Sequence, residues 1–496
     1  MKKTIAYLLL LTLCLGLLTG CGDIVIDGSK DGGSSAPAAS NTASASAAKG
    51  AEIRLEGDGA SFKGSGVSVS GGTVTIASPG EYSVSGTLNS GCIVVNTGEV
   101  KGDVTLTLRG AEITNPDGPA IHVQQVKNFV LALEKDTQNR LVSGAEGAAV
   151  PGVKLEGAAL FSEDDLDIVG EGALEIIGNL NNGITCKDDL DILGGEITVT
   201  AVNNGVRGAE SVEISGGNLS ITAGNDGVKS TSALKEGKGF VSISGGVLTI
   251  SAGGDGISAE TNLEISGGEI SVQTSGAVAG VSCKGLKAKS LVSISGGSIT
   301  VDSLDHALHS SENMLLLDGS YTLASRGGKG ISANGALEIR GGSYDINAAD
   351  DGINAENALS VLGGEIRLLA GADGLKAGSK TTGVGTIDIQ GGTISVSAYD
   401  DPVDAKSGAV ISGGSFAGVG TAKSPKGFEA SSTQRSLVFS LSGGAGSTAQ
   451  IVAENGSAVA SIEARCGYTC AIYSAPELAP GSYRLVLGTL SAEAAA

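Results

Sequence analysis

This 496-residue chain contains no tryptophan and few aromatic residues of any kind. Aromatic residues make up 3% of the sequence, with 8 tyrosines and 7 phenylalanines. Flat platforms that bind crystalline cellulose generally use exposed aromatic rings, so this composition argues against crystalline cellulose as the main ligand. Histidine is also scarce, with His122, His306 and His309 as the full set. The sequence shows no Ser-His-Asp or Cys-His arrangement, which leaves nucleophilic catalysis of that kind without support.

Positive charge is in short supply as well. The chain carries 32 Lys and Arg against 53 Asp and Glu, a formal net charge of −21. A protein this acidic does not bind nucleic acid through a general electrostatic field, so no nucleic-acid partner is expected. Binding to any acidic polymer would need a bridging cation or a local basic patch.

Long hydrophobic runs are confined to the N-terminus. Lys2 and Lys3 precede an apolar run from Ile5 to Leu18, which is typical of a secretion signal and short for a membrane span. The following Leu18-Thr19-Gly20-Cys21 resembles the bacterial lipobox, which implies cleavage before Cys21 and lipid attachment to its thiol. The alternative is an ordinary signal peptide with a chance cysteine. We therefore expect a signal peptide at 1–21, a Ser- and Ala-rich flexible tether at 22–50, and a secreted lipoprotein at the bacterial cell surface whose membrane contact is the lipid anchor alone.

A glycine-marked repeat recurs about ten times between residues 160 and 415. Each copy has an alternating strand, a Gly-Gly pair, a second alternating strand and an acidic or amide turn, as in LDILGGEITVTAVNNGVRG (190–208). The turn glycine, or the residue in its place, is expected at Gly183, Gly205, Gly227, Gly256, Gly280, Ala307, Gly330, Gly352, Gly374 and Pro402. Period-two alternation indicates strands, and a repeat of this length indicates a solenoid. The sequence predicts an all-β fold, a right-handed parallel β-helix over 51–430.

The two ends depart from the repeat. Residues 51–160 alternate without the regular turn and are expected to form irregular first coils. Residues 431–496 predict four or five antiparallel strands, a small β-domain that caps the last coil. Cys186 and Cys283 are expected at small inward positions three residues after a turn glycine, and Cys466 and Cys470 are close enough to bond in an oxidising location.

The turns carry a column of acidic residues. Stacked strands lie about 5 Å apart, so aspartates that recur at one repeat position place like charges side by side, which is destabilising. A hard divalent cation removes that penalty, and calcium takes six to eight oxygen ligands. We expect a calcium site with ligands among Asp226, Asp255, Asp350, Asp351, Asp373, Asp400, Asp401 and Asp404. The alternative is that Asn, Asp and Gly at these positions serve the turns alone.

A second acidic series stands where two strands begin. Asp164 and Asp165 precede one strand, and Asp188 and Asp189 precede the equivalent strand one coil later. These four carboxylates are further candidate calcium ligands. The alternative interpretation is a solvated strand entrance.

Three segments that lengthen the repeat are basic. They are TSALKEGKGF (231–240), KGLKAKS (284–290) and GSKTTGVG (378–385), and all three are expected to project from one side of the solenoid. A basic rim beside a calcium-loaded ladder suits an anionic glycan, although lysines also serve to keep loops soluble. The expected contacts are Lys229, Lys235, Lys238, Lys284, Lys287, Lys289, Lys376, Lys380 and Arg207.

The strings LFSEDDLDIVGEGALEI, NLNNGITCKDDLDILGGEITVTAVNNGVRG, GNDGVKS, GGDGISAETNLEISGG and DHALHS closely resemble a bacterial family of calcium-containing β-helix carbohydrate-binding proteins. The resemblance covers roughly 50–490. It implies a pectate-lyase-like fold and a secreted or surface-attached protein that binds acidic polysaccharide with calcium.

Three functions compete at this point. The first is non-catalytic, calcium-dependent binding of an acidic polysaccharide such as polygalacturonate. The second is a polysaccharide lyase, in which calcium acidifies the α-proton of a uronate and Arg207, Lys229 or Lys376 acts as the base. The third is a structural surface adhesin without a glycan ligand. Release of unsaturated uronate separates the second from the first, and glycan binding separates both from the third.

Overall fold

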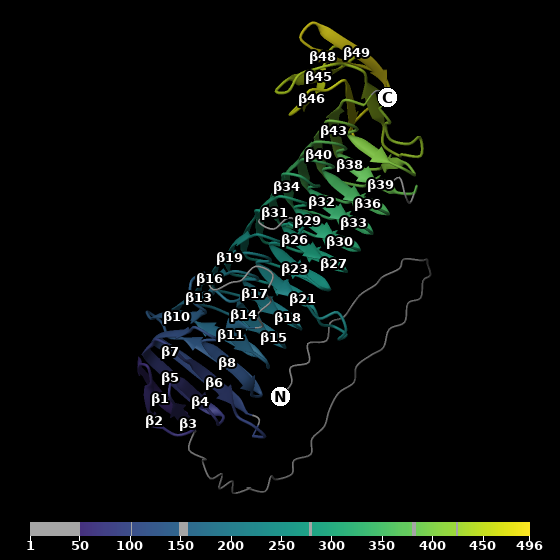
Figure 1. Cartoon of the computed structure of the whole chain (residues 1–496). Coiled ribbons are helices and arrows are strands. Elements are labelled where there is room, and N and C mark those ends of the chain that lie inside the picture. Colours follow the sequence, from purple (N-terminus) through teal and green to yellow (C-terminus); the bar gives the residue numbers. More distant parts are fainter. Residues whose placement is uncertain (1–49, 101, 148–156, 277–279, 379–382, 423–424) are drawn as a thin grey trace, which may run out of the picture. The chain divides into compact units, whose positions relative to one another are not determined.

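The computed structural model describes residues 50–496 except 101, 148–156, 277–279, 379–382 and 423–424. The described residues form strands and turns without a helix, and the strands stack as a β-solenoid of about 13 turns with parallel sheets (Figure 1). The expected parallel β-helix is therefore confirmed. Among these residues no helix is long and apolar enough to span a membrane. The expected signal peptide, Cys21 and the tether lie outside the described residues and stay predictions.

Each regular coil contributes one strand to each of three faces. Face one contains β9 (Asn128–Leu133), β12 (Leu166–Gly170), β15 (Asp189–Ile192), β18 (Ser211–Ile214), β21 (Phe240–Ile243), β24 (Asn262–Ile265), β27 (Leu291–Ile294), β30 (Asn313–Leu316), β33 (Ala336–Ile339), β36 (Ala358–Val361), β39 (Thr386–Ile389) and β42 (Ala409–Ile411). Face two contains β10 (Gln138–Ser143), β13 (Ala173–Gly178), β16 (Glu196–Ala201), β19 (Asn218–Ala223), β22 (Val247–Ala252), β25 (Glu269–Thr274), β28 (Ser298–Ser303), β31 (Ser320–Ser325), β34 (Ser343–Ala348), β37 (Glu365–Ala370), β40 (Thr393–Ala398) and β43 (Ser415–Gly420).

Face three follows the acidic turns, and its strands are short. It contains β4 (Thr73–Ile76), β6 (Cys92–Asn96), β8 (Ile121–Gln125), β11 (Ala158–Ser162), β14 (Asn182–Cys186), β17 (Val206–Gly208), β20 (Val228–Ser230), β23 (Ile257–Ala259), β26 (Leu286–Ala288), β29 (Leu308–Ser310), β32 (Ile331–Ala333), β35 (Ile353–Ala355), β38 (Leu375–Ala377) and β41 (Val403–Ala405). The chain begins with β1 (Gly50–Gly57), β2 (Ala60–Gly64), β3 (Val67–Ser70), β5 (Gly80–Leu88) and β7 (Asp103–Asn115).

The core follows directly from the alternation. In β16 the side chains of Ile197 and Val199 are buried, whereas the flanking Thr198 and Thr200 face solvent. Each inward side chain stacks on its equivalent one coil away, as Val199 does on Ile221. Burial of these ladders along the axis holds together coils that would not be stable alone.

The register corrects one predicted turn. Leu286 pairs with Ile257 and with Leu308, so the turn glycine of this coil is Gly285 and not Gly280. The longer connection therefore precedes the turn, and segment 284–290 holds a turn and strand β26 and is no insertion. Cys283 lies two residues before this glycine, outside the position of Cys186.

The C-terminal strands close the last coil. β44 (Ser436–Phe439) and β47 (Cys470–Ser474) continue the sheet of β43 in antiparallel pairing. The strands β45 (Thr448–Ala453), β46 (Ala458–Glu463), β48 (Ser482–Leu487) and β49 (Leu490–Ala495) form a separate antiparallel sheet. A second apolar core, which includes Leu437, Phe439 and Ile451, lies among these strands. Cys466 and Cys470, which are close enough in sequence to bond, are free thiols in this structure.

Candidate functional site

The residue before each turn glycine forms a column along the edge of face three. Backbone hydrogen bonds hold this column in place. The N–H of each turn glycine donates to the carbonyl of the column residue in the next coil, as the N–H of Gly205 does to Asp226 at 3.0 Å. We call this column the turn ladder, with the members Asn182, Asn204, Asp226, Asp255, Lys284, His306, Lys329, Asp351, Asp373 and Asp401. The sequence alone left Lys284 and Lys329 out of it. Lys329 directly precedes the predicted turn glycine Gly330, so its place in the ladder could have been predicted from the sequence. The place of Lys284 follows only from the register that makes Gly285 the turn glycine.

Side chains of the ladder also bond the backbone of the next coil. Asp226 Oδ1 accepts the N–H of Asp255 at 2.9 Å, and Asp373 Oδ1 accepts the N–H of Asp401 at 3.1 Å. Asn182 Oδ1 accepts the N–H of Asn204 in the same way at 3.1 Å. An acceptor oxygen at this position therefore has a structural use, whether an amide or a carboxylate supplies it, although Lys284 and Lys329 provide none.

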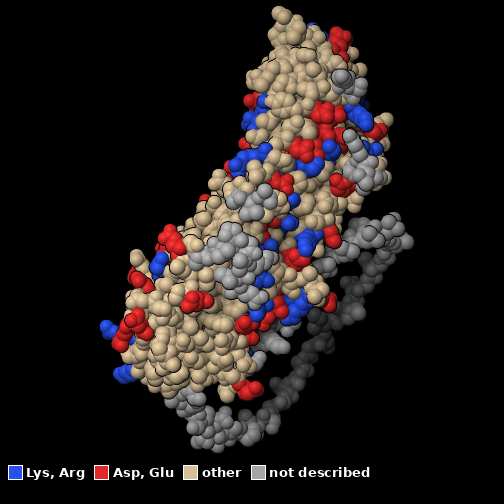
Figure 2. Space-filling view, viewed as in Figure 1, with Lys and Arg blue, Asp and Glu red and all other residues tan. Residues whose placement is uncertain are grey.

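Lysines neutralise most of the ladder carboxylates. Lys229 Nζ lies 2.6 Å from Asp226, and Lys287 Nζ lies 3.0 Å from Asp255. Lys376 Nζ reaches Asp373 at 2.8 Å and Asp351 at 3.0 Å, and Lys329 also bonds Asp351. Figure 2 shows acidic and basic side chains interleaved along the molecule. The repulsion that motivated calcium at Asp226, Asp255 and Asp351 is thus relieved by lysine.

These pairs set the charge state of the ladder. Burial alone would raise the pKa of Asp351, but the hydrogen bonds and charges of Lys329 and Lys376 outweigh it and lower that pKa. Burial works against the charge of Lys376, yet its two aspartate partners raise its pKa above the ordinary value. A lysine held protonated in this way is a poor general base, which weakens the case for Lys376 as the base of a lyase.

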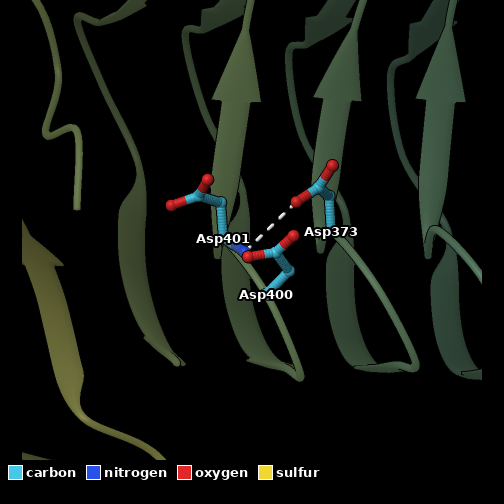
Figure 3. A group of neighbouring side chains, drawn as sticks. All are labelled: Asp373, Asp400 and Asp401. Atoms are coloured by element: carbon cyan, nitrogen blue, oxygen red, sulfur yellow. Dashed lines mark hydrogen bonds between the residues drawn. The ribbon is translucent and has the colours of Figure 1, made fainter. Parts of the chain in front are cut away.

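The last coil differs from the rest. Asp373, Asp400 and Asp401 offer one carboxylate oxygen each within 4.8 Å of one another, and this is the one such group of three among the described residues. Figure 3 shows them projecting from two neighbouring coils, with the N–H of Asp401 bonded to Asp373. We call these three residues the aspartate cluster.

Asp401 is the final member of the ladder among the described residues. Its Oδ1 is buried and has no hydrogen-bond partner among the described residues. Burial, followed by the charges of Asp373, Asp400 and Asp404, raises the pKa of Asp401 to about 6. A buried carboxylate oxygen without a donor is costly, and a cation bound there would remove that cost.

The residues of the cluster fit a hard cation. All the potential ligand atoms are carboxylate oxygens, which calcium and magnesium prefer and which soft metals do not. Asp404 lies nearby in β41, the last strand of face three, but Lys406 donates to it at 2.5 Å. Asp373 and Asp401 bury most of their side-chain surface in the turns that lead into β38 and β41, whereas Asp400 is exposed.

The remaining predicted ligands are not gathered into such a group within the described residues. Asp350 is half exposed, with Lys329 at 3.7 Å. Asp164 accepts the N–H of Val126 at 2.8 Å, and Asp165 accepts that of Asp189 at 3.3 Å. Burial and then the charge of Glu210 raise the pKa of Asp188.

The predicted glycan-binding lysines are each paired where the structure describes them. Lys235 lies 2.5 Å from Glu210, Lys238 lies 2.7 Å from one Asp189 oxygen, and Lys284 lies 2.6 Å from Asp305. Lys289 bonds Glu260, and Arg207 donates to Thr231 at 3.3 Å. Lys380 lies outside the described residues. An alanine at Lys287 would leave the buried Asp255 without its cation, so such a variant tests stability together with binding.

Two histidines lie in the middle of the solenoid, His306 in the ladder and His309 in β29 beside it. His306 Nδ1 accepts the N–H of Lys329 at 2.9 Å, and its ring lies 5.3 Å from that of His309. Burial, then the charges of Lys284 and His306, lower the pKa of His309 to about 4. Burial likewise lowers the pKa of His306, so both rings are neutral at pH 7 and add no charge to the ladder.

Two matches to one family model cover residues 70–328 and 311–465, and the description of that family is carbohydrate-binding domain-containing protein. The chain belongs to this carbohydrate-binding family. A curated relative of the same description from Acetivibrio thermocellus is 37% identical over 138 residues, which are 27% of this chain and 48% of the relative. The chain thus spans about half the length of that relative.

A solved structure shares 34% sequence identity with this chain. It is described as the polysaccharide lyase-like protein from C. thermocellum, gadolinium derivative, and the alignment covers 49% of this chain and 96% of that one with a TM-score of 0.44.

Proposed function

We propose that this carbohydrate-binding protein binds an acidic polysaccharide of the polygalacturonate type without cleaving it, and that calcium held by the aspartate cluster joins the two. The observation that carries the proposal is the unpartnered, buried Oδ1 of Asp401 beside Asp373 and Asp400. Three carboxylates leave several calcium positions for other oxygens. A uronate carboxylate is a suitable ligand there, because the protein and the glycan are both anionic and a shared cation relieves their repulsion.

Membership of the family supports binding of a carbohydrate, and the chemistry of the cluster supports the acidic class. The predicted lipobox at Cys21 supports a place at the bacterial cell surface, where the tether would let the solenoid reach a polymer outside the cell. The lipid anchor and the surface location are part of this proposal.

A glycan array probed in calcium and again after chelation tests the proposal. We expect signal on polygalacturonate and related polyuronates in calcium, its loss with EDTA, and no comparable signal on neutral glucans. Calcium-independent binding to neutral glycans would contradict the proposal. The same samples, incubated with polygalacturonate and read by ultraviolet absorbance, should show no unsaturated uronate. Release of that product would establish the lyase alternative.

A further inference from the structure

Tyr399 is unlike the other tyrosines of the described chain. It is 57% exposed, whereas Tyr82, Tyr321, Tyr344, Tyr468, Tyr473 and Tyr483 are all buried. It directly follows β40 and directly precedes Asp400 and Asp401, so its ring is carried by the same turn as the aspartate cluster. A single exposed apolar side chain is ordinary. The position of this one within the repeat makes it informative.

The neighbours of Tyr399 at the same repeat position are small. The N–H of Tyr399 donates to the carbonyl of Ala370 at 3.0 Å, so Tyr399 is the equivalent of Gly371 one coil later. The N–H of Gly371 donates to the carbonyl of Ala348 at 2.9 Å, so Gly371 is in turn the equivalent of Ala349. A glycine and an alanine on the two preceding coils leave no large side chain beside the ring on that side. A sugar ring lying along the edge of the solenoid would meet backbone and methyl groups there.

Two more exposed apolar residues share this repeat position. Val202 and Leu304 are 45% and 40% exposed and follow β16 and β28 as Tyr399 follows β40. Four coils separate each from the next, because β16, β19, β22, β25, β28, β31, β34, β37 and β40 pair in that order. The spacing is about 19 Å at the distance between stacked strands. The three residues thus form a broken apolar line parallel to the solenoid axis and beside the turn ladder.

We propose that Tyr399 is a sugar-stacking residue, and that the polysaccharide lies along this edge of the solenoid with one ring against Tyr399 and a neighbouring carboxylate at the aspartate cluster. The inference rests on the proposed function and adds to it the place and direction of the glycan. An aromatic face suits the C–H-rich face of a pyranose, while the hydroxyl end stays hydrated. Leu304 and Val202 contact the same chain only when it is long enough to reach them.

The test compares affinities for a short oligogalacturonate in calcium between wild type, Tyr399→Ala and Tyr399→Phe, measured by calorimetry. Leu193→Ala is the matched control, because Leu193 is 50% exposed but follows β15 at a different corner of the coil. We expect Tyr399→Ala to bind about tenfold more weakly, and the other two variants to bind like wild type. Calcium affinity measured without glycan should be equal in all four proteins.

The oligosaccharide should also perturb the near-ultraviolet absorbance of wild type, which has no tryptophan to mask tyrosine, and this signal should vanish in Tyr399→Phe although binding persists. Equal affinity of wild type and Tyr399→Ala would overturn the inference and leave the proposed function standing. Equal weakening by alanine and phenylalanine would overturn stacking in favour of a contact through the hydroxyl. A wild type that binds no acidic glycan in calcium would overturn the inference and the proposed function together.

Discussion

Asp191 lies on the outer side of β15 between two other acidic side chains. It pairs with Asp167 on one neighbouring coil and with Glu213 on the other, and its Oδ1 is buried without a hydrogen-bond partner among the described residues. Burial, then the charges of Glu213 and Asp167, raise the pKa of Asp191 to about 7, and Asp189 and Asp165 add to the effect. Lys238 bonds the neighbouring Asp189.

This residue predicts a pH dependence of stability. The pKa of an unfolded aspartate is about 3.9, so the folded state holds the Asp191 proton more tightly. The stability that this proton contributes is fully present below about pH 3.9 and is lost as the pH rises from there through about 7. Asp191→Asn should therefore melt at a higher temperature than wild type at pH 8, by about 2 °C, and show a flatter profile between pH 5 and 8.

The matched control is Asp388→Asn, at the same repeat position but between the uncharged Ser360 and Val410. Its melting profile should follow that of wild type. An Asp191→Asn protein that melts below wild type at pH 8 would show that the carboxylate is stabilised there by a partner, such as a bound cation.

Lys376 predicts a second residue-level effect. It is the cation shared by Asp351 and Asp373, whose side chains are 1% and 8% exposed. Lys376→Met should destabilise the fold by about 2 kcal/mol, less than for a fully buried pair because Asp351 keeps Lys329. The same substitution at Lys135, whose pair with Glu171 is exposed on both sides, should leave the stability close to that of wild type. Urea midpoints compare the two variants, and equal midpoints would show that the ladder pair adds no more than a surface pair.

The strands could be predicted from the sequence because they follow from local residue patterns. Alternation in segments such as Glu196–Ala201, and Gly-Gly pairs between them, fix the strand period without reference to distant residues. The turn glycine of the fifth regular coil could not be assigned from the sequence, because both Gly280 and Gly285 stand where a turn glycine is possible. Only the pairing of Leu286 with Ile257 identifies Gly285. The lysine–aspartate pairs were out of reach for the same reason. Lys287 and Asp255, for example, are brought together by stacking across 32 residues.

The aspartate cluster could be predicted from the sequence only in part. Asp373, Asp400 and Asp401 all belonged to the predicted acidic turns, but nothing local distinguished Asp400 and Asp401 from Asp226, Asp351 and Asp373, which lysines neutralise. What sets Asp400 and Asp401 apart is their place at the end of the ladder, where no later ladder member among the described residues donates an N–H to Asp401. That is a property of the stack and not of the turn.

The cluster predicts a calcium effect on thermal stability. Calcium that binds the folded state alone should raise the melting temperature of chelated protein as its concentration increases. The double variant Asp400→Asn/Asp401→Asn should lose this rise, whereas Asp164→Asn, at the other acidic series, should keep it. An identical rise in wild type and the double variant would place the calcium elsewhere.

The cap predicts the behaviour of a truncated chain. β47 covers β43 in antiparallel pairing, and the apolar cluster of Leu437 and Phe439 lies in the cap strands. Removal of 431–496 should leave β43 as an open edge, which promotes association of chains. Sedimentation should then show larger species than for the full-length protein. A monomeric truncated protein with the wild-type melting temperature would mean that the solenoid protects its own end.

At the scale of the whole molecule, the solenoid converts a repeat position into a line parallel to its axis. The turn ladder, with its lysine–aspartate pairs, is nearly neutral along most of that line and has its unbalanced carboxylates at the last coil. A long anionic polymer would therefore be held chiefly at one end, by calcium, and lie along the edge. Binding that relies on a short-range cation bridge should persist at moderate salt, in contrast to binding through a free basic rim.

The most direct test of the central claim is calorimetric titration of the protein with polygalacturonate in millimolar calcium, after chelation, and with the Asp400→Asn/Asp401→Asn variant in calcium. The account predicts binding in the first case and at least about tenfold weaker binding in the other two. Polygalacturonate affinity that is the same in all three titrations would contradict it.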